Sequence, residues 1–493
     1  MASFLVVLFA APLQSQTLKL ERTLPIPTPS LQKGHSWEGV QIGVLDSTQA
    51  VLSLGTRNPK SKGDQSVAST RYLARYASAN NTADTAELIS PILLRFMGEK
   101  IYPAGFMAMD SVAHFFYSQF LPKKKSFRLF AYTVNLKDTA AKTSFNILFE
   151  IPTSDPDQVA FRFAQTGAHF GLAFMQLEDD KNDRAILTWK VYTQKLKTVF
   201  QRTEKINFGG GNVALFDFSL SPELVGLTTL EHSHSKSQPD GLAYYVFSNE
   251  RTSVYKGELF VAQNQALFGT WTRYNTDSAH FVLGGILAPS AFRIPERIFH
   301  FQIPLQRVDL PEGGIFPMPA NWVTAWKEDK RPFGLRYYNQ LVSAYRIRPS
   351  SETPMSMVYM AGGAYKNKPF QSDLLVLGTN RSGIAYTARM ERNVRVDGLN
   401  SAVGLVTLDD HGAFVLAHGA SETLAPSKKP VDATGPVLTQ VLPNGSFERI
   451  ALPLPSDATG TYFYEGVEQL DATRFTLPYR TTNGISLALY TFD

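Results

Sequence analysis

The chain contains no cysteine among its 493 residues. This absence excludes disulfide bonds, thiolate zinc and iron–sulfur centres, cysteine nucleophiles and covalent attachment of c-type haem. Stability must therefore come from packing and strand pairing. If the chain is exported, the lack of disulfides fits a bacterial envelope better than a eukaryotic extracellular module.

Sequence signatures of cofactor and metal binding are also missing. Gly209–Gly211 is not a phosphate-binding loop, because neither a lysine nor a helical pattern follows it. His232 and His234 have a spacing that suits a metal, but no third ligand is placed beside them. The acidic stretch Glu178–Asp183 does not follow the calcium-loop pattern. No cofactor and no metal site is predicted.

The charge is weakly basic and is not gathered into a patch. The formal net charge is +5 and the pI is about 9.0, a small excess for a chain of this length. Lys123–Lys125 is the one basic cluster, and it has no interleaved aromatic residues on a common face. No nucleic-acid partner is predicted.

The first residues resemble a secretory signal peptide. An apolar run from Phe4 to Leu13 is followed by short polar residues, and a run of about ten residues is too short to span a bilayer. We expect residues 1–16 to be a signal peptide cleaved after Ser15 or Gln16, with no transmembrane segment. The mature protein would be periplasmic, cell-surface-associated or extracellular. No basic residue precedes the apolar run, which leaves two alternatives, a true start further upstream or a buried first strand.

The remainder of the chain predicts an all-β fold. Helical periodicity is almost absent, while short apolar or alternating runs bounded by turn residues recur throughout. Asn444-Gly445, between two such runs, is the strongest hairpin signal. The runs include Ile101–Asp110, Val112–Phe120, Ser126–Asn135, Thr143–Ile151, Val159–Gln165, Gly171–Glu178, Ala185–Thr193, Val213–Leu220, Leu242–Ser248, Ala266–Tyr274, His280–Leu287 and Arg297–Val308.

The continuous spacing of these runs favours a single β-propeller over residues 17–493, with about seven four-stranded antiparallel blades. Six or eight blades remain open, because 65–87 is ambiguous and 309–331 is interpreted as a loop insertion rich in proline and glycine. A chain of β-sandwiches is the competing architecture, but no linker divides the sequence. Thr17–Leu24 is expected to pair with Ile485–Phe492 and so close the ring.

The signatures of named propeller repeats are absent. No recurring Gly-His and Trp-Asp pair is present, and Gly284-Gly285 and Gly362-Gly363 lack the companion residues of kelch repeats. From Phe161 to Asp493, the rhythm of strands and turns resembles that of divergent, exported bacterial β-propeller-like proteins of no named family. The resemblance implies the fold and transfers no catalytic residue.

The predicted function rests on the fold class, because no motif in the sequence indicates an activity. Because no reactive constellation stands out, an enzyme is disfavoured, and we expect a non-enzymatic binding or scaffold protein of the bacterial cell envelope or exterior. Its partner would be a protein or a polysaccharide, with peripheral association with an outer-membrane complex as one possibility. The insertion supplies the residue types of binding hot spots, namely Phe316, Trp322, Trp326 and Arg331.

The alternative is a carbohydrate-active hydrolytic propeller with carboxylates at a central channel. A propeller can bring acids from different blades to its axis, where they could act as a catalytic pair. The acids in or beside predicted strands that fit this reading are Asp110, Asp217, Asp373 and Glu391.

Overall fold

The computed structural model is all-β and mostly antiparallel, with three short 3-10 helices among the residues it describes. It describes 17–492 with interruptions, the longest being 58–69, 321–339, 345–354 and 419–430. The 3-10 helices are η1 (Pro122–Lys124), η2 (Pro156–Gln158) and η3 (Tyr464–Gly466). No helix in this described part is long and apolar enough to cross a membrane.

The first half of the chain forms four-stranded sheets one after another, each from four consecutive strands. The first contains β2 (Ser36–Asp46), β3 (Gln49–Arg57), β4 (Thr70–Ala77) and β5 (Thr85–Ile92). The short pair β6 (Arg95–Phe96) and β7 (Glu99–Lys100) follows. The second contains β8 (Tyr102–Met109), β9 (Val112–Leu121), β10 (Ser126–Asn135) and β11 (Ser144–Pro152). The third contains β12 (Val159–Thr166), β13 (His169–Leu177), β14 (Arg184–Thr193) and β15 (Thr198–Asn207).

Two more sheets of the same design come next. One contains β16 (Asn212–Leu220), β17 (Gly226–Ser233), β18 (Asp240–Phe247) and β19 (Tyr255–Ala262). The other contains β20 (Ala266–Asn275), β21 (His280–Ala288), β22 (Arg297–Pro304) and β23 (Glu312–Pro317). Every neighbouring pair of strands in these two sheets is antiparallel.

The later sheets are less uniform. A larger sheet contains β24 (Gln340–Ala344), β25 (Met355–Tyr365), β26 (Lys368–Asn380), β27 (Gly383–Met390), β28 (Val394–Arg395) and β31 (Val431–Asp432). Its β28 and β31 are parallel. The next sheet contains β29 (Gly404–Leu408), β30 (Gly412–His418), β32 (Pro436–Val441) and β33 (Phe447–Ile450). Here β32 and β33 form the hairpin that Asn444-Gly445 predicts.

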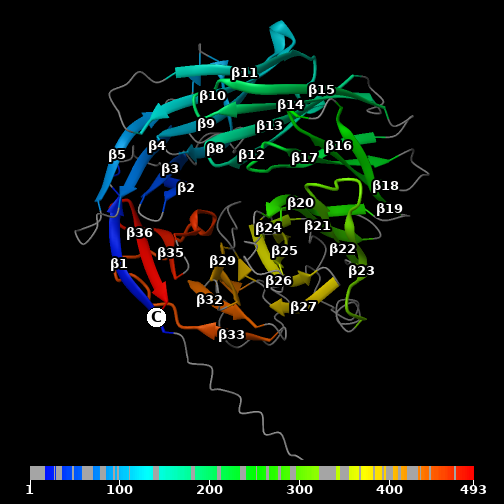
Figure 1. The fold of residues 1–493 in the computed structure, drawn as a ribbon. Helices are drawn as coiled ribbons and strands as arrows, with labels where there is room; N and C mark the ends of the chain where they lie inside the picture. The colour runs from blue at the N-terminus through cyan, green and yellow to red at the C-terminus, as the bar shows by residue number, and fades with distance from the viewer. Residues whose placement is uncertain are drawn as a thin grey trace, which may run out of the picture.

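The last sheet joins the two ends of the described chain. It contains β34 (Glu468–Gln469), β35 (Arg474–Arg480), β36 (Ile485–Phe492) and β1 (Leu18–Ile26). β1 is antiparallel to β36, with Leu18 opposite Phe492 and Ile26 opposite Ile485. Figure 1 shows β1 along the outer side of β36.

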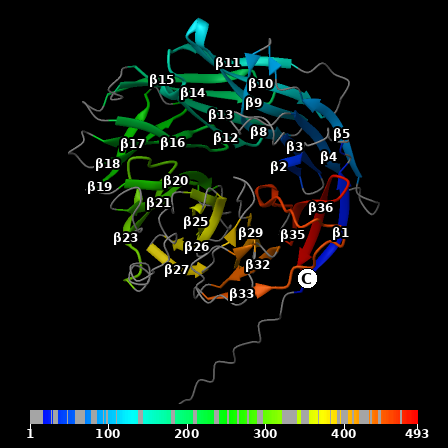
Figure 2. The same cartoon turned by 180° about the vertical axis from the view of Figure 1, so that it is seen from behind.

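The sheets are arranged around a common centre (Figure 1). In this view and in the view from behind (Figure 2), β2, β8, β12, β16 and β20 lie nearest the centre, and β5, β11, β15, β19 and β23 lie at the circumference. Successive central strands pack on one another, β2 on β8, β12 on β16, and β16 on β20. The first strand of each of these sheets is therefore the one that can contribute to a site at the axis.

The hydrophobic core lies between neighbouring sheets. One cluster combines Leu187, Trp189 and Val191 of β14 with Leu215 and Phe218 of β16, among other residues. The two sheets approach closely at Gly171, where an added Cβ would stand 2.6 Å from the ring of Phe218. The clusters on the other side of the β16–β19 sheet likewise take members from two sheets.

The position of a strand within its sheet explains its residue pattern. The third strand, β14, is largely buried, because both of its faces meet a neighbouring sheet. The outer strand β15 alternates between buried and exposed residues for most of its length. Outer strands therefore carry more polar residues and give weaker apolar signals.

Part of the predicted insertion at 309–331 is regular structure. Residues Glu312–Pro317 form β23, whose Ile315 and Phe316 stand opposite Phe299 and Ile298 of β22. This corrects the prediction of a loop for these residues. The prediction failed because two glycines and a proline interrupt the apolar pattern, which an outer strand tolerates. The remainder of the prediction, from 321 onward, lies outside the described residues.

Candidate functional site

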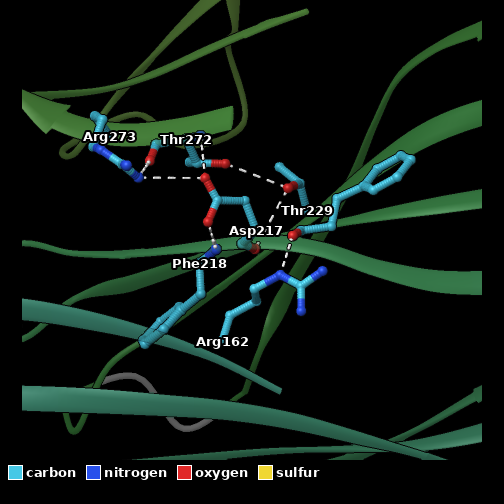
Figure 3. A network of polar contacts seen from close by, with 7 residues as sticks. Arg162, Asp217, Phe218, Thr229, Thr272 and Arg273 are labelled. Atoms are coloured by element: carbon cyan, nitrogen blue, oxygen red, sulfur yellow. Dashed lines mark hydrogen bonds and ion pairs between the residues drawn. The ribbon is translucent and has the colours of Figure 1, made fainter. Parts of the chain in front are cut away.

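A group of polar side chains lies at the axial ends of three successive sheets. It comprises Arg162 on β12, Asp217 on β16, Thr229 on β17, and Thr272 and Arg273 on β20, and we call it the axial polar cluster (Figure 3). Its members come from positions as far apart as 162 and 273. Three of the strands that carry them, β12, β16 and β20, are the central strands of their sheets.

A β-bulge in β16 shapes the cluster. The register of β16 against β17 shifts between Leu215 and Asp217. A bulge disturbs the ladder and lets consecutive side chains point to the same side of the sheet. Leu215 packs toward the β12–β15 sheet, whereas Phe216 packs toward the β20–β23 sheet, as does the carboxylate of Asp217.

Arg162 holds this bulge from the neighbouring sheet. Its Nε donates to the carbonyl of Phe216 at 2.5 Å, and its Nη2 donates to the carbonyl of Leu215 at 3.1 Å. Its Nη1 donates to the carbonyl of Phe161 at 2.7 Å. The guanidinium thus bonds the two carbonyls at the bulge, which gives it a fixed position and fixes the strand that carries Asp217.

The carboxylate of Asp217 connects β16 to β20. Oδ1 accepts the backbone N–H of Phe218 at 2.8 Å, and Oδ2 accepts the backbone N–H of Thr272 at 2.7 Å. Nη1 of Arg273 lies 3.4 Å from Oδ2. The Asp217 side chain is 18% exposed and that of Arg273 is 51% exposed, so the carboxylate is largely buried while the cation beside it reaches solvent.

Two buried hydroxyls complete the group. The Oγ1 atoms of Thr229 and Thr272 are 3.3 Å apart, and Thr229 Oγ1 lies 3.5 Å from the carbonyl of Asp217. Both threonines are fully buried. Their contact supports the backbone on either side of the carboxylate.

Burial is the largest cause of the pKa shifts of Asp217 and of Arg162, which bonds the bulge. Desolvation raises the pKa of Asp217, while Arg273, the amides of Phe218 and Thr272, and Arg162 act in the opposite direction without cancelling it. Desolvation also lowers the pKa of Arg162, and the nearby Asp217 opposes that change. An arginine keeps its charge under such a shift. A carboxyl with a raised pKa is suited to proton transfer.

The residues named from the sequence fall in different places. Of the four candidate acids, Asp217 belongs to the axial polar cluster. Asp373 lies in β26, but its side chain is not among those described, and Asp110 and Glu391 lie outside the described residues.

Of the four predicted partner-binding residues, one lies in the described part of the chain. Phe316 is a partly buried residue of β23. Trp322, Trp326 and Arg331 lie outside the described residues, so their role stays a prediction. His232 is buried, and its Nε2 lies 3.3 Å from Oε1 of Glu258. In the described part of the chain no three histidine or acidic side chains are grouped as a metal site would require.

Sequence reasoning missed Arg162, Thr272 and Arg273. These residues carry no motif, because nothing in their spacing relates β12 to β16 or β16 to β20. A faint signal existed in β20, where Thr272-Arg273 interrupts an otherwise apolar run. Only the packing of the three central strands assembles the cluster.

No family model and no curated protein matches the chain, which agrees with the expectation of a divergent propeller-like protein of no named family. Solved structures are similar in fold. A prolyl endopeptidase shares 10% identity at a TM-score of 0.36 over 91% of this chain and 54% of its own, so this chain spans about half of that protein.

Two further similar structures are covered over most of their lengths. The β-propeller domain of a protease from Pyrococcus furiosus shares 10% identity at a TM-score of 0.33, over 80% of this chain and 93% of that domain. A Synechocystis apocarotenoid oxygenase shares 8% identity at a TM-score of 0.39, over 93% and 94% of the two chains. Likenesses at these levels concern the fold and assign no activity to this chain.

The comparison nevertheless corrects one prediction. The solved structures that resemble this chain are mainly enzymes, including an acylaminoacyl peptidase and an arabinanase besides those above. They contradict the expectation of a non-enzymatic binding or scaffold protein. That expectation rested on the lack of a reactive motif within any one segment, and a site assembled from several sheets leaves no such motif.

Proposed function

We propose that this protein is a carbohydrate-active hydrolase with its site at the axis of the propeller. The observation that supports the proposal is the carboxyl of Asp217, which stands on a central strand, is partly exposed, and has a raised pKa. Hydrolysis of a glycosidic bond uses a carboxyl group that can hold a proton and transfer it to the leaving oxygen.

In this proposal Asp217 is the catalytic acid or base and Arg162 is a positioning residue. Arg162 donates to the carbonyls of Leu215 and Phe216, the two residues that precede Asp217. The amides of Phe218 and Thr272 orient the carboxylate. A carboxyl held from several directions keeps its geometry during proton transfer, which favours catalysis.

Glycoside hydrolysis uses a second carboxylate. Three acids stand on other strands of the axial region, Glu38 and Asp46 on β2 and Glu468 on β34, and their side chains are not among those described. β2 packs on β8 and on η3, and β34 packs on β29. From the position of these strands, we propose Glu38 and Glu468 as the candidates for the second role.

The proposal also specifies the ring. We propose that the eight sheets of four or more strands in the described structure are the blades of one propeller, closed by β1 on β36. This is one blade more than the preferred count from the sequence and one of the alternatives left open. Removal of 17–26 should then expose β36 and lower the thermal midpoint of the protein, whereas an unchanged midpoint would contradict closure.

Export remains a proposal of its own. We propose that 1–16 is a cleaved signal peptide, because the apolar run is short and precedes polar residues. Mass spectrometry of the native protein should find an N-terminus at Gln16 or Thr17. An intact Met1 or an uncut apolar run in the mature protein would contradict it.

The activity is tested with the full mature chain on neutral and uronate-containing polysaccharides, by following new reducing ends. We expect release from at least one substrate and a loss of about 100-fold or more in kcat for Asp217→Asn. Asp457→Asn is the matched control, since Asp457 accepts the hydroxyl of Tyr479 far from the cluster. Absence of release from every substrate, or full activity of Asp217→Asn, would overturn the proposal.

The second carboxylate is tested in the same assay. Either Glu38→Gln or Glu468→Gln should lower kcat strongly while leaving the fold intact by circular dichroism. Full activity of both variants would exclude these two residues from the role.

A further inference from the structure

The axial polar cluster has an excess of positive charge. It contains the guanidinium groups of Arg162 and Arg273 and the single carboxyl of Asp217, whose raised pKa further reduces its negative charge. The cluster therefore favours an additional negative charge from outside the protein.

The two arginines differ in how their donors are used. Arg162 directs Nε, Nη1 and Nη2 at backbone carbonyls of β12 and β16. Arg273 makes its hydrogen bonds to other described residues through Nη1 alone, to Thr272 and Asp217. No described residue accepts from its Nε or Nη2, and half of the side chain is exposed, at 51%.

A guanidinium with Nε and Nη2 available presents two parallel donors, an arrangement that matches the two oxygens of a carboxylate. Nη1 meanwhile anchors the group beside Asp217 at 3.4 Å. A ligand carboxylate bound by Arg273 would therefore lie next to the proposed catalytic carboxyl. Figure 3 shows the Arg273 guanidinium and the Asp217 carboxylate approaching each other from β20 and β16.

We propose that Arg273 binds the carboxylate of a uronic acid residue, so that the substrate is an acidic polysaccharide. This inference rests on the proposed function and names its substrate class. A uronate carries the planar carboxylate that fits the arginine and the glycosidic bond that Asp217 would act on. A neutral sugar would leave the excess positive charge unpaired.

The inference is tested by calorimetric titration of the full mature chain with trigalacturonate and trimannuronate, each compared with its methyl ester. Esterification removes the charge and changes little else. We expect the acids to bind at least about tenfold more tightly than the esters, the range for a charge-assisted hydrogen bond. Arg273→Gln should abolish this preference, and Arg273→Lys should restore only part of it because the fork is lost.

Arg297→Gln is the matched control, since Arg297 is an exposed arginine of the same sheet on β22. It should keep the preference for the acids. Equal affinities for acids and esters, failure of both acids to bind, or an unchanged preference in Arg273→Gln would overturn the inference.

Reducing ends measured on the same samples separate this inference from the proposed function. Hydrolysis of neutral oligosaccharides with no preference for the acids would refute the uronate and retain the hydrolase. Binding of the acids that depends on Arg273, without hydrolysis of any substrate, would retain the carboxylate site and refute the hydrolase.

Discussion

The two faces of the β16–β19 sheet bury different chemistry. Toward the β12–β15 sheet, Leu215 and Phe218 join a large cluster of buried apolar side chains around Trp189. Toward the β20–β23 sheet, apolar residues share the joint with polar groups, namely the partly buried Asp217 and the fully buried pair Thr229 and Thr272. The first joint is suited to hold sheets together, and the second also places an ionisable group between them.

One strand produces both environments. In a regular β16 successive side chains would alternate between the faces, but the bulge between Leu215 and Asp217 lets Phe216 and Asp217 both face β20. The neighbouring strand β17 remains regular and sends adjacent threonines to opposite joints. Thr228 accepts the indole N–H of Trp189 at 2.7 Å, and Thr229 contacts Thr272 at 3.3 Å. A local irregularity in one strand can thus create a polar site beside an apolar core.

The largest expected effect is on the apolar joint. Trp189→Ala should lower the free energy of unfolding by about 3 to 5 kcal/mol, because it leaves a cavity in a fully buried cluster. Urea denaturation measures the loss. Phe447→Ala is the control, since Phe447 is 47% exposed, and it should cost less than about 0.5 kcal/mol. Similar losses for the two variants would mean that the joint does not carry the stability assigned to it.

Asp217→Ala should lower the free energy of unfolding by about 3 kcal/mol. The substitution removes the acceptor of the N–H groups of Phe218 and Thr272, and it leaves the charge of Arg162 less compensated. Asp217→Asn keeps an acceptor oxygen and should cost clearly less. The same urea titrations compare the two variants. An equal cost for alanine and asparagine would show that the hydrogen bonds to Asp217 contribute little.

The raised pKa of Asp217 predicts a pH dependence. The folded protein holds this proton more tightly than the unfolded chain, whose pKa is the ordinary 3.8. Its contribution to stability is therefore complete below pH 3.8 and declines as the pH rises through the folded pKa.

We expect the wild type to lose stability relative to Asp217→Asn over that window, by at most about 1.4 kcal/mol per pH unit. Thermal unfolding of both proteins from pH 3 upward measures the difference. A difference that is independent of pH, or that grows in favour of the wild type, would show that burial does not control this carboxyl.

The smallest expected effects on stability come from Thr228 and Thr229, which point to opposite faces of β17. Thr228→Val removes the acceptor of a buried indole N–H and should cost about 1 to 2 kcal/mol. Thr229→Val removes a longer contact between two hydroxyls and should cost about 1 kcal/mol or less. Chemical denaturation resolves the pair. The reverse order would indicate that the polar joint contributes more to stability than its geometry implies.

Much of the strand pattern is predictable from the sequence. The expected run Val159–Gln165 corresponds to β12 at Val159–Thr166, and Ala185–Thr193 corresponds to β14 at Arg184–Thr193. These strands are central or covered on both faces, so they need apolar residues and leave a clear signal. The outer strands β15 and β23 were not predicted, because residues such as Gln201 and Glu312 alternate with few buried side chains.

The candidate site was predictable only in part. Asp217 was among four acids that the sequence left equivalent, and no local feature ranked it above Asp110, Asp373 or Glu391. Its partners Arg162 and Arg273 were not identified, because an arginine in a strand resembles any solvated residue until its neighbours in space are known. The function predicted from the absence of motifs was wrong for the same reason.

The sequence by itself determined a disulfide-free, all-β chain of antiparallel sheets, since periodicity and turn chemistry act over a few residues and are readable locally. Only the tertiary structure decided which face of β16 is polar and which strands meet at the axis. It also decided that the partly buried carboxyl of Asp217 stands beside Arg273, whose sequence neighbours alone would not reveal the contact. These properties depend on contacts between residues more than 50 positions apart, such as Asp217 with Thr272, and no local pattern encodes them.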